Sequence, residues 1–215
     1  MNEISFEEAI LTMLSSIDDS LYKLKSGLPD PEAVNYYELK KERKLYLHSD
    51  VDACLVQYHQ LILQWNLEDE GKPIEERRPI IIYIMSGGGY LNYMWMFIDA
   101  MNMSKTPIYT VNIGNASSAA ALIFLSGNKR FMTPHSRILI HEGSAQFEGD
   151  ATKVMDATES YKKELKAMKE YILSKTKIER NSLMKKRAND WELSAEYCLA
   201  NGACEAIVES FDEVK

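Results

Sequence analysis

The stretch of residues 108–127 constrains the fold more than any other part of the chain. Residues 108–113 read as a strand that leads into Gly114; Ser117 and Ser118 follow, and then an apolar run, 119–125. We interpret this as a strand, a tight turn and a helix that is apolar on nearly every side and therefore buried. A serine in the first turn of such a helix lies among unpaired backbone N–H groups that favour negative charge. It is either a helix N-cap or a nucleophile whose reaction develops an oxyanion.

The composition predicts one globular core without a nucleic-acid or membrane partner. Of the 215 residues, 46% are hydrophobic and 27% are charged, which suffices for a sizeable core with an appendage. The net charge is -7 and the basic clusters are short, unlike a nucleic-acid surface. No apolar run approaches the ~18 residues of a membrane span, and the acidic N-terminus is unlike a secretory signal. Three cysteines without metal-ligand spacing indicate the cytoplasm, and we expect no metal or other cofactor.

Predicted strands and helices alternate over most of the chain. We expect strands at residues 45–47, 79–85, 108–113, 130–132, 138–140 and 206–208. We expect helices at residues 51–64, 91–103, 119–125 and 194–199. The uninterrupted apolar segment 79–85 is typical of a strand that is buried on both faces of a parallel sheet. The alternation therefore predicts an α/β fold.

Two further predicted helices are amphipathic. Ser5 and Glu8 form a capping box that opens a predicted helix over residues 5–25, which packs either on its own core or on another chain. A second, polar helix is predicted over residues 150–176. Its stripe repeats at spacings of three and four and consists of Val154, Ala157, Tyr161, Leu165, Met168 and Ile172. A stripe this narrow indicates a helix that leaves the globule and packs against a neighbour.

Three features near strand ends could form a catalytic site. The triplet 87–89 consists of glycines that either make a plain turn or let backbone amides approach an oxyanion. His141 ends a predicted strand, where it is either a structural histidine or a general base. Asp190 could orient that histidine, or it could be a loop acid ahead of the helix cap at Ser194, and spacing alone does not select it over its neighbours.

The ordered set of these motifs resembles the proteolytic subunit of the Clp protease. The resemblance covers roughly residues 34–215. The motifs that carry it, in chain order, are YELKKERKLYL (37–47), IYIMSGGG (82–89), GNASSA (114–119), SRILIH (136–141), FEGDA (147–151) and DWELSA (190–195). Each motif alone is weak evidence for this family, whereas all six motifs in this order are strong evidence for it.

The resemblance implies roles for individual residues. Ser118, rather than Ser117, would be the nucleophile, His141 the base and Asp190 the acid that orients it. The amides of Gly89 and Ala119 would form the oxyanion hole. The implied fold consists of repeated β-β-α units of the type shared with crotonases, with a protruding handle at about residues 143–177. Residues 1–33 would be an additional N-terminal helical extension to a peptidase domain of residues 34–215.

The family also implies an assembly. Its members form heptameric rings, stacked in pairs as a tetradecamer around a chamber, and a ring-shaped AAA+ unfoldase feeds them unfolded proteins. We therefore expect a cytoplasmic homo-oligomer that cleaves peptide bonds. Two alternatives stay open: a catalytically silent ring subunit of the same family, and an acyl-CoA enzyme of the crotonase type.

The chain departs from the family pattern at several places. Gly87 replaces a usual proline, and Glu142 with Gly143 follows the histidine where Gln-Pro is common. Asn189 stands where many members have an arginine that helps to lock two rings. Residues 71–78 resemble a loop insertion. The N-terminal helix replaces a short axial loop, which bears on how an ATPase would engage.

Overall fold

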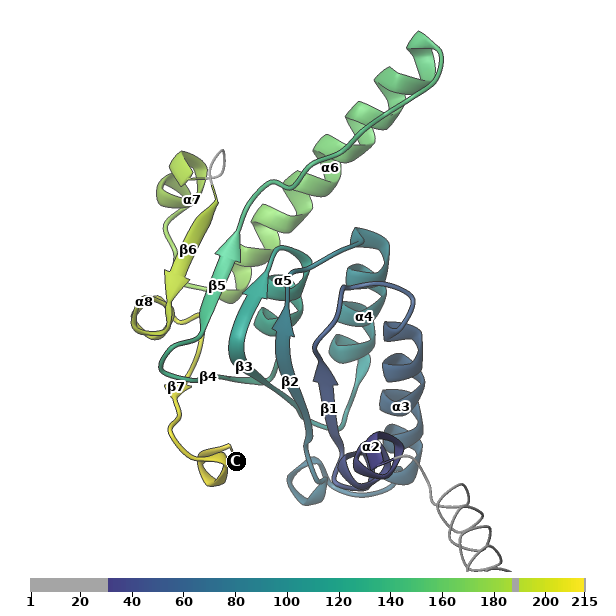
Figure 1. Cartoon of the computed structure of the whole chain (residues 1–215), viewed down its shortest axis with the longest axis vertical. Coiled ribbons are helices and arrows are strands. Elements are labelled where there is room, and N and C mark those ends of the chain that lie inside the picture. The colour runs from purple at the N-terminus through teal and green to yellow at the C-terminus, as the bar shows by residue number, and fades with distance from the viewer. Residues whose placement is uncertain (1–30, 187–189, 215) are drawn as a thin grey trace, which may run out of the picture. The chain divides into compact units, whose positions relative to one another are not determined.

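The computed structural model describes residues 31–186 and 190–214 (Figure 1). The helix predicted over residues 5–25 and the departure at Asn189 lie outside the described residues. The structure separates at residue 43 into two compact units, which we describe individually. The described part of the first unit consists of helix α2 (Pro31–Lys41) and Glu42. All of the following features belong to the second unit.

A mainly parallel sheet forms the centre of this unit. Its strands are β1 (Lys44–Leu47), β2 (Ile80–Ser86), β3 (Ile108–Ser117), β4 (Lys129–Met132), β5 (Arg137–Ile140), β6 (Trp191–Ser194) and β7 (Ala206–Ile207). The main path of the sheet is β1-β2-β3-β4-β7, and every pair along it is parallel. Strand β5 pairs in parallel with β3, and β6 pairs antiparallel with β5.

The helices pack mostly on one face of this sheet. They are α3 (Leu55–Glu68), α4 (Leu91–Met103), α5 (Ala119–Leu125), α6 (Ala151–Lys175), α7 (Arg180–Lys186) and α8 (Ala195–Ala200), with short 3-10 turns η1 (Ile74–Glu76) and η2 (Phe211–Glu213). The alternation of strands with helices confirms the predicted α/β class. Within the described residues, each helix is too short or too polar to cross a lipid bilayer.

The two faces of the sheet are buried to different degrees. Ile80, Ile82 and Ile84 of β2 point into the main core beneath the helices. Between them, Ile81 and Tyr83 point into a smaller cluster on the opposite face. Met85 at the end of the strand is 57% exposed. The prediction of a strand buried on both faces is therefore correct for one face and only partly correct for the other.

Strand β3 forks the sheet. Residues 109–112 pair with β4, whereas residues 115–117 pair with β5. The strand was expected to end at Ile113 with a turn at Gly114, and this prediction is wrong because the second set of pairs extends the strand to Ser117. The turn is thereby moved to a single residue, Ser118, between β3 and α5.

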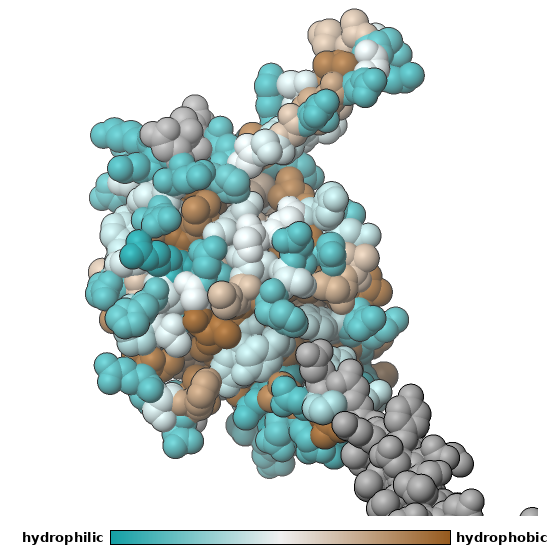
Figure 2. All heavy atoms as spheres, viewed as in Figure 1, coloured by the Kyte–Doolittle hydropathy of each residue, from teal (hydrophilic) through white to brown (hydrophobic). Residues whose placement is uncertain are grey.

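Helix α6 is anchored at one end and extends beyond the sheet at the other (Figure 1). Its C-terminal half buries Met168 and Ile172, and the Trp95 indole donates a 2.8 Å hydrogen bond to Glu164. The N-terminal half of the stripe is only half-buried, and Met155 there is 70% exposed. Figure 2 shows hydrophobic spheres among hydrophilic ones at this projecting end. The predicted helix over residues 150–176 is thus confirmed, and half of its stripe is only partly covered within the described protomer.

Candidate active site

Ser118 occupies a sharp turn whose backbone is held on both sides. Its N–H donates to the carbonyl of Leu139 at 2.8 Å, and its own carbonyl accepts from the amide of Ala121 at 3.0 Å. The backbone angles are φ 55 and ψ -123, a conformation that costs a non-glycine residue about 1–3 kcal/mol. The buried helix α5 and strand β5 therefore fix a strained residue. A serine on a sharp strand-to-helix turn is also how α/β-hydrolases expose their nucleophile.

His141 and Asp190 are brought together by the pairing of two strands. Strands β5 and β6 are antiparallel and pair Ile140 with Trp191, so the next residues outward are His141 and Asp190. His141 Nδ1 lies 3.5 Å from Asp190 Oδ1. The neighbouring acid Glu192 instead pairs with Arg137 at 3.0 Å. This pairing, which spacing in the sequence could not reveal, distinguishes Asp190 from the acid next to it.

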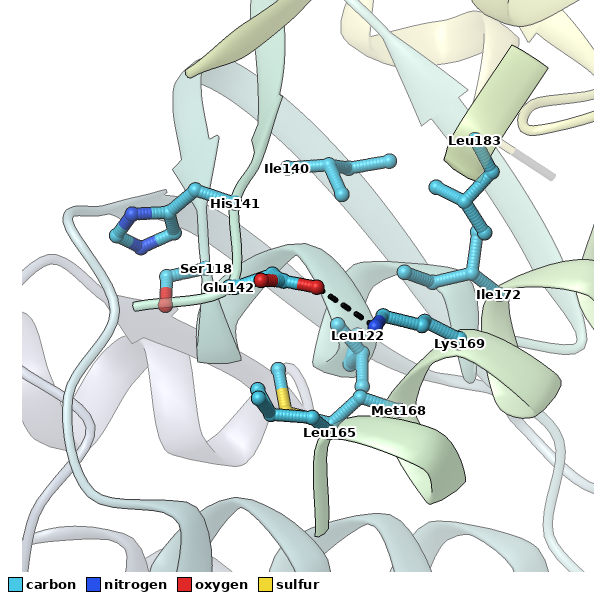
Figure 3. Close-up of a pocket in the computed structure, with 10 residues that line it drawn as sticks. All are labelled: Ser118, Leu122, Ile140, His141, Glu142, Leu165, Met168, Lys169, Ile172 and Leu183. Atoms are coloured by element: carbon cyan, nitrogen blue, oxygen red, sulfur yellow. Dashed lines mark ion pairs between the residues drawn. The ribbon is translucent and has the colours of Figure 1, made fainter. Parts of the chain in front are cut away.

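Ser118 and His141 line the same hollow, which has a volume of about 350 Å³. Figure 3 shows the Ser118 side chain next to the imidazole. Among the described residues, no hydrogen bond joins the two side chains, and the contact between Nδ1 and Oδ1 is longer than a standard hydrogen bond. Catalytic hydrogen bonds are often long before substrate binds, so this geometry is compatible with a resting nucleophile and base.

The glycine triplet brings its backbone against the Ser118 turn. At Gly88, φ is 100, and an added Cβ would lie 2.7 Å from the Ser117 carbonyl oxygen and from the Ser118 Cβ. A side chain there would clash with fixed atoms. At Gly87 an added Cβ would meet open space. The close approach of Gly88 to the Ser118 turn therefore does not depend on whether residue 87 is glycine or the family's usual proline.

Two backbone amides are available beside Ser118. Gly89 forms a parallel bridge with Val51, in which the amides of Val51 and Tyr90 make the hydrogen bonds. The N–H of Gly89 therefore points away from Val51, and Gly89 lines the hollow that contains Ser118. Ala119 is the first residue of α5, so its N–H has no acceptor within the helix. Two such donors suit an oxyanion.

Ser118 also lines a second, smaller cavity of about 20 Å³, whose lining residues are drawn in Figure 3. This is room for about one water molecule. Its apolar walls consist of Leu122, Ile140, Leu165, Met168, Ile172 and Leu183. Glu142 and Lys169 also line it, and Lys169 Nζ lies 2.6 Å from Glu142 Oε1.

The sequence did not reveal the contacts that residue 142 makes with α6. The Tyr161 hydroxyl donates to the Glu142 carbonyl at 2.7 Å, and burial together with the Glu142 charge raises the pKa of Tyr161. Tyr161 and Lys169 are eight residues apart on the helix, which places them on one face. That spacing was visible, but a lysine on a polar helix is usually solvated. Among the described residues, no group of three or more His, Cys, Asp or Glu side chains could hold a metal ion.

Comparison with known proteins identifies the family of the chain. The family model described as Clp protease matches residues 31–211. The chain belongs to the Clp protease family. The match confirms the resemblance inferred from the six motifs and agrees with the α/β fold.

Three curated Clp relatives show how far the similarity extends. All three are ATP-dependent Clp protease proteolytic subunits. The one from Chlorella vulgaris is 33% identical over 137 residues, covering 62% of this chain and 65% of its own length. The one from Oltmannsiellopsis viridis is 34% identical over 137 residues, covering 62% of this chain and 67% of its own. The one from Deinococcus radiodurans is 26% identical over 180 residues, covering 83% and 86%. The matches to the first two thus span only about two thirds of those proteins.

Proposed function

We propose that the chain is a serine endopeptidase with Ser118 as nucleophile, His141 as base and Asp190 as the orienting acid. One observation carries the proposal. The antiparallel pairing of β5 with β6 brings Asp190 within 3.5 Å of His141 Nδ1, while His141 shares a hollow with Ser118. Membership of a peptidase family supports the same assignment.

The proposed mechanism follows from this order of groups. Asp190 faces Nδ1 of His141, which leaves Nε2 to take the proton of Ser118 as its Oγ attacks a peptide carbonyl. The amides of Gly89 and Ala119 would stabilise the negative oxygen of the tetrahedral intermediate. His141 then passes its proton to the leaving amine. Water enters in its place, and the same base activates it to hydrolyse the acyl-enzyme.

The proposed assembly is a homo-oligomeric ring, a heptamer or a pair of stacked heptamers, formed by a peptidase domain of residues 34–215. The half-exposed stripe of α6 supports contact with another subunit. The names of the three relatives contain the words ATP-dependent, which supports an ATP-driven unfoldase as partner and unfolded polypeptides as substrates. Cys54, Cys198 and Cys204 are free thiols, which supports the cytoplasm as location.

Covalent labelling with a fluorophosphonate tests the chemistry. We expect the wild-type chain to be acylated and Ser118→Ala to lose both acylation and peptide hydrolysis, by about 10⁴- to 10⁶-fold in rate. Ser117→Ala is the matched control, because the Ser117 hydroxyl is buried and bonded to Asn115 at 3.0 Å. It should still be labelled.

The same experiment separates the rival functions. A wild-type chain that resists labelling would be a silent ring subunit. Turnover of an acyl-CoA by Ser118→Ala at the wild-type rate would indicate the crotonase alternative. Labelling that disappears in Ser117→Ala but persists in Ser118→Ala would show that Ser117, and not Ser118, is the nucleophile.

A further inference from the structure

The glycine turn that follows β2 depends on outside contacts to keep one conformation. Gly88 and Gly89 have φ angles of 100 and 153, and glycine leaves such angles easily because it has no Cβ to restrict the backbone. Gly88 also lies against the Ser118 turn, since an added Cβ there would come 3.1 Å from the Ala119 nitrogen. A shift of the glycine turn would therefore change how the amides of Gly89 and Ala119 are placed relative to each other.

Hydrogen bonds fix two consecutive peptide groups of this turn. The Gly88 carbonyl accepts from the Val51 amide at 2.8 Å. Because a trans peptide group is planar, the N–H of Gly89 in the same group points the opposite way, away from Val51, and Gly89 lines the hollow that contains Ser118. The preceding peptide group is held by a side chain, since the N–H of Gly88 donates to Ser86 Oγ at 3.2 Å.

Ser86 is itself fixed by the sheet and by a neighbouring segment. It is the last residue of β2 and pairs with Ala116, two residues before Ser118. Ser86 is buried, and its hydroxyl donates at 2.6 Å to the carbonyl of Ser49, in the segment that leads to Val51. One hydroxyl therefore joins the end of a strand, this segment and the glycine turn, with both its proton and a lone pair in use.

We propose that Ser86 is a positioning residue of the oxyanion hole, whose hydroxyl orients the glycine turn so that the Gly89 N–H faces the oxygen that gains charge beside Ser118. The inference deepens the proposed function and rests on it. Among the described residues, Gly87 and Gly89 line the hollow and Ser86 does not, so Ser86 acts through the turn and not on the substrate. Oxyanion donors are effective only when they are held in place before the reaction.

Loss of this hydroxyl should misalign the donor without removing it. The Gly88 N–H would lose its acceptor, and the two glycines leave the backbone free to rotate toward another one. The Val51 hydrogen bond to the Gly88 carbonyl would remain and limit that rotation. Removal of a whole oxyanion donor lowers kcat about 10²- to 10³-fold, so a partial misalignment should cost about tenfold.

The test compares two substrates of the full chain, N-acetyl-leucine p-nitrophenyl ester and its thiono counterpart, in which sulfur replaces the carbonyl oxygen. Sulfur is a weak hydrogen-bond acceptor, so the thiono ester gains little from the oxyanion hole. Ser86→Ala should lower kcat/KM about tenfold for the oxygen ester and about twofold or less for the thiono ester. A purely structural loss of active protein would lower both values equally and leave their ratio unchanged.

Ser126→Ala is the matched control. Ser126 is also a buried serine with two contacts, because its hydroxyl donates to the Leu122 carbonyl at 2.7 Å and lies 2.8 Å from the Tyr171 hydroxyl. It follows the last residue of α5, at the opposite end of that helix from Ser118. Its substitution should leave the ratio of the two kcat/KM values at the wild-type level. An equal fall of the ratio in both variants, or an unchanged ratio in Ser86→Ala, would overturn the proposal.

Hydrogen exchange followed by mass spectrometry gives a second measurement that does not depend on turnover. The amides of residues 87–90 should exchange faster in Ser86→Ala than in the wild-type chain or in Ser126→Ala, and equal exchange in all three would overturn the role of Ser86. Should Ser86→Ala fail to fold, Ser86→Cys nearly keeps the volume but has a weaker acceptor, and it should move the ratio and the exchange in the same directions.

Failure of the proposed function would look different. A wild-type chain that neither cleaves the two esters nor reacts with a fluorophosphonate would contradict the serine peptidase chemistry. The exchange of residues 87–90 would then still decide whether Ser86 holds the glycine turn. A wild-type chain that reacts normally, with the same ester ratio and the same exchange in Ser86→Ala, would leave the proposed function in place and overturn only the role of Ser86.

Discussion

The proposed nucleophile and its proposed base are held in contrasting ways. Every residue of α5 is buried, and both backbone groups of Ser118 are hydrogen-bonded to neighbouring elements. His141 and Asp190, in contrast, are 33% and 71% exposed and lie just beyond the ends of two four-residue strands. Packing thus fixes the serine within the protomer, whereas the acid–base pair depends on contacts at the edge of the structure. Mutations around α5 should therefore mainly lower the stability of the fold, whereas mutations of the His141–Asp190 pair should mainly lower the rate of peptide hydrolysis.

The largest expected effect is on rate, at the exposed edge. Asp190→Asn should lower kcat/KM by about 10³- to 10⁴-fold, because an amide cannot hold the imidazole in the required tautomer or stabilise its charged form. Its unfolding free energy should change by less than about 0.5 kcal/mol, since the side chain is mostly exposed. Peptide hydrolysis and denaturant unfolding measure the two quantities.

Glu192→Gln is the matched control for Asp190→Asn. Glu192 is also an exposed acid of the β6 segment, but its partner is Arg137. Its substitution should leave kcat/KM within about twofold, as expected for a surface pair of small net energy. Equal losses in the two variants would mean that the edge responds to charge in general, and that Asp190 has no special role.

The sequence predicted the features that depend on neighbouring residues. The serine turn was recognisable because a strand, a glycine, two serines and an apolar run follow one another within twenty residues. His141 was recognisable because it ends a strand. The extension of β3 to Ser117 was missed because it depends on pairing with β5, whose partner residues lie twenty-two positions further along the chain.

The acid side of the site was harder to predict for the same reason. Strand β6 was not predicted, since its apolar/polar alternation covers only four residues and is too short to indicate a strand by itself. Only its antiparallel register with β5 sets Asp190 opposite His141. Lys169 was missed because its acceptor, Glu142, lies before the start of the same helix and is reached only when the C-terminal half of α6 packs against α5. The Clp resemblance supplied Asp190, and no local pattern would have.

The next largest effect is on stability, in the buried region. Phe124→Ala should destabilise the fold by about 3–5 kcal/mol, because Phe124 is fully buried in α5 and the truncation leaves a cavity. Denaturant unfolding measures the change. Phe211→Ala removes the same side chain where it is 75% exposed and should cost about 1 kcal/mol or less. If the two variants unfolded at the same denaturant concentration, packing around α5 would not be what holds Ser118.

The smallest expected effect on the protomer is at the projecting end of α6, where assembly should respond instead. Val154 is half-buried at the start of the stripe, so Val154→Glu should leave the protomer fold intact by circular dichroism. In a contact between subunits, however, it would bury a carboxylate without a partner, at about 1–3 kcal/mol or more for each contact. We expect smaller species by light scattering and slower peptide hydrolysis. Lys163→Ala changes the net charge equally, nine residues away on the opposite face of the helix, and should assemble normally. An unchanged mass in Val154→Glu would show that no second subunit covers this end of α6. The exposed edge of the active site would then have to function without support from a neighbour.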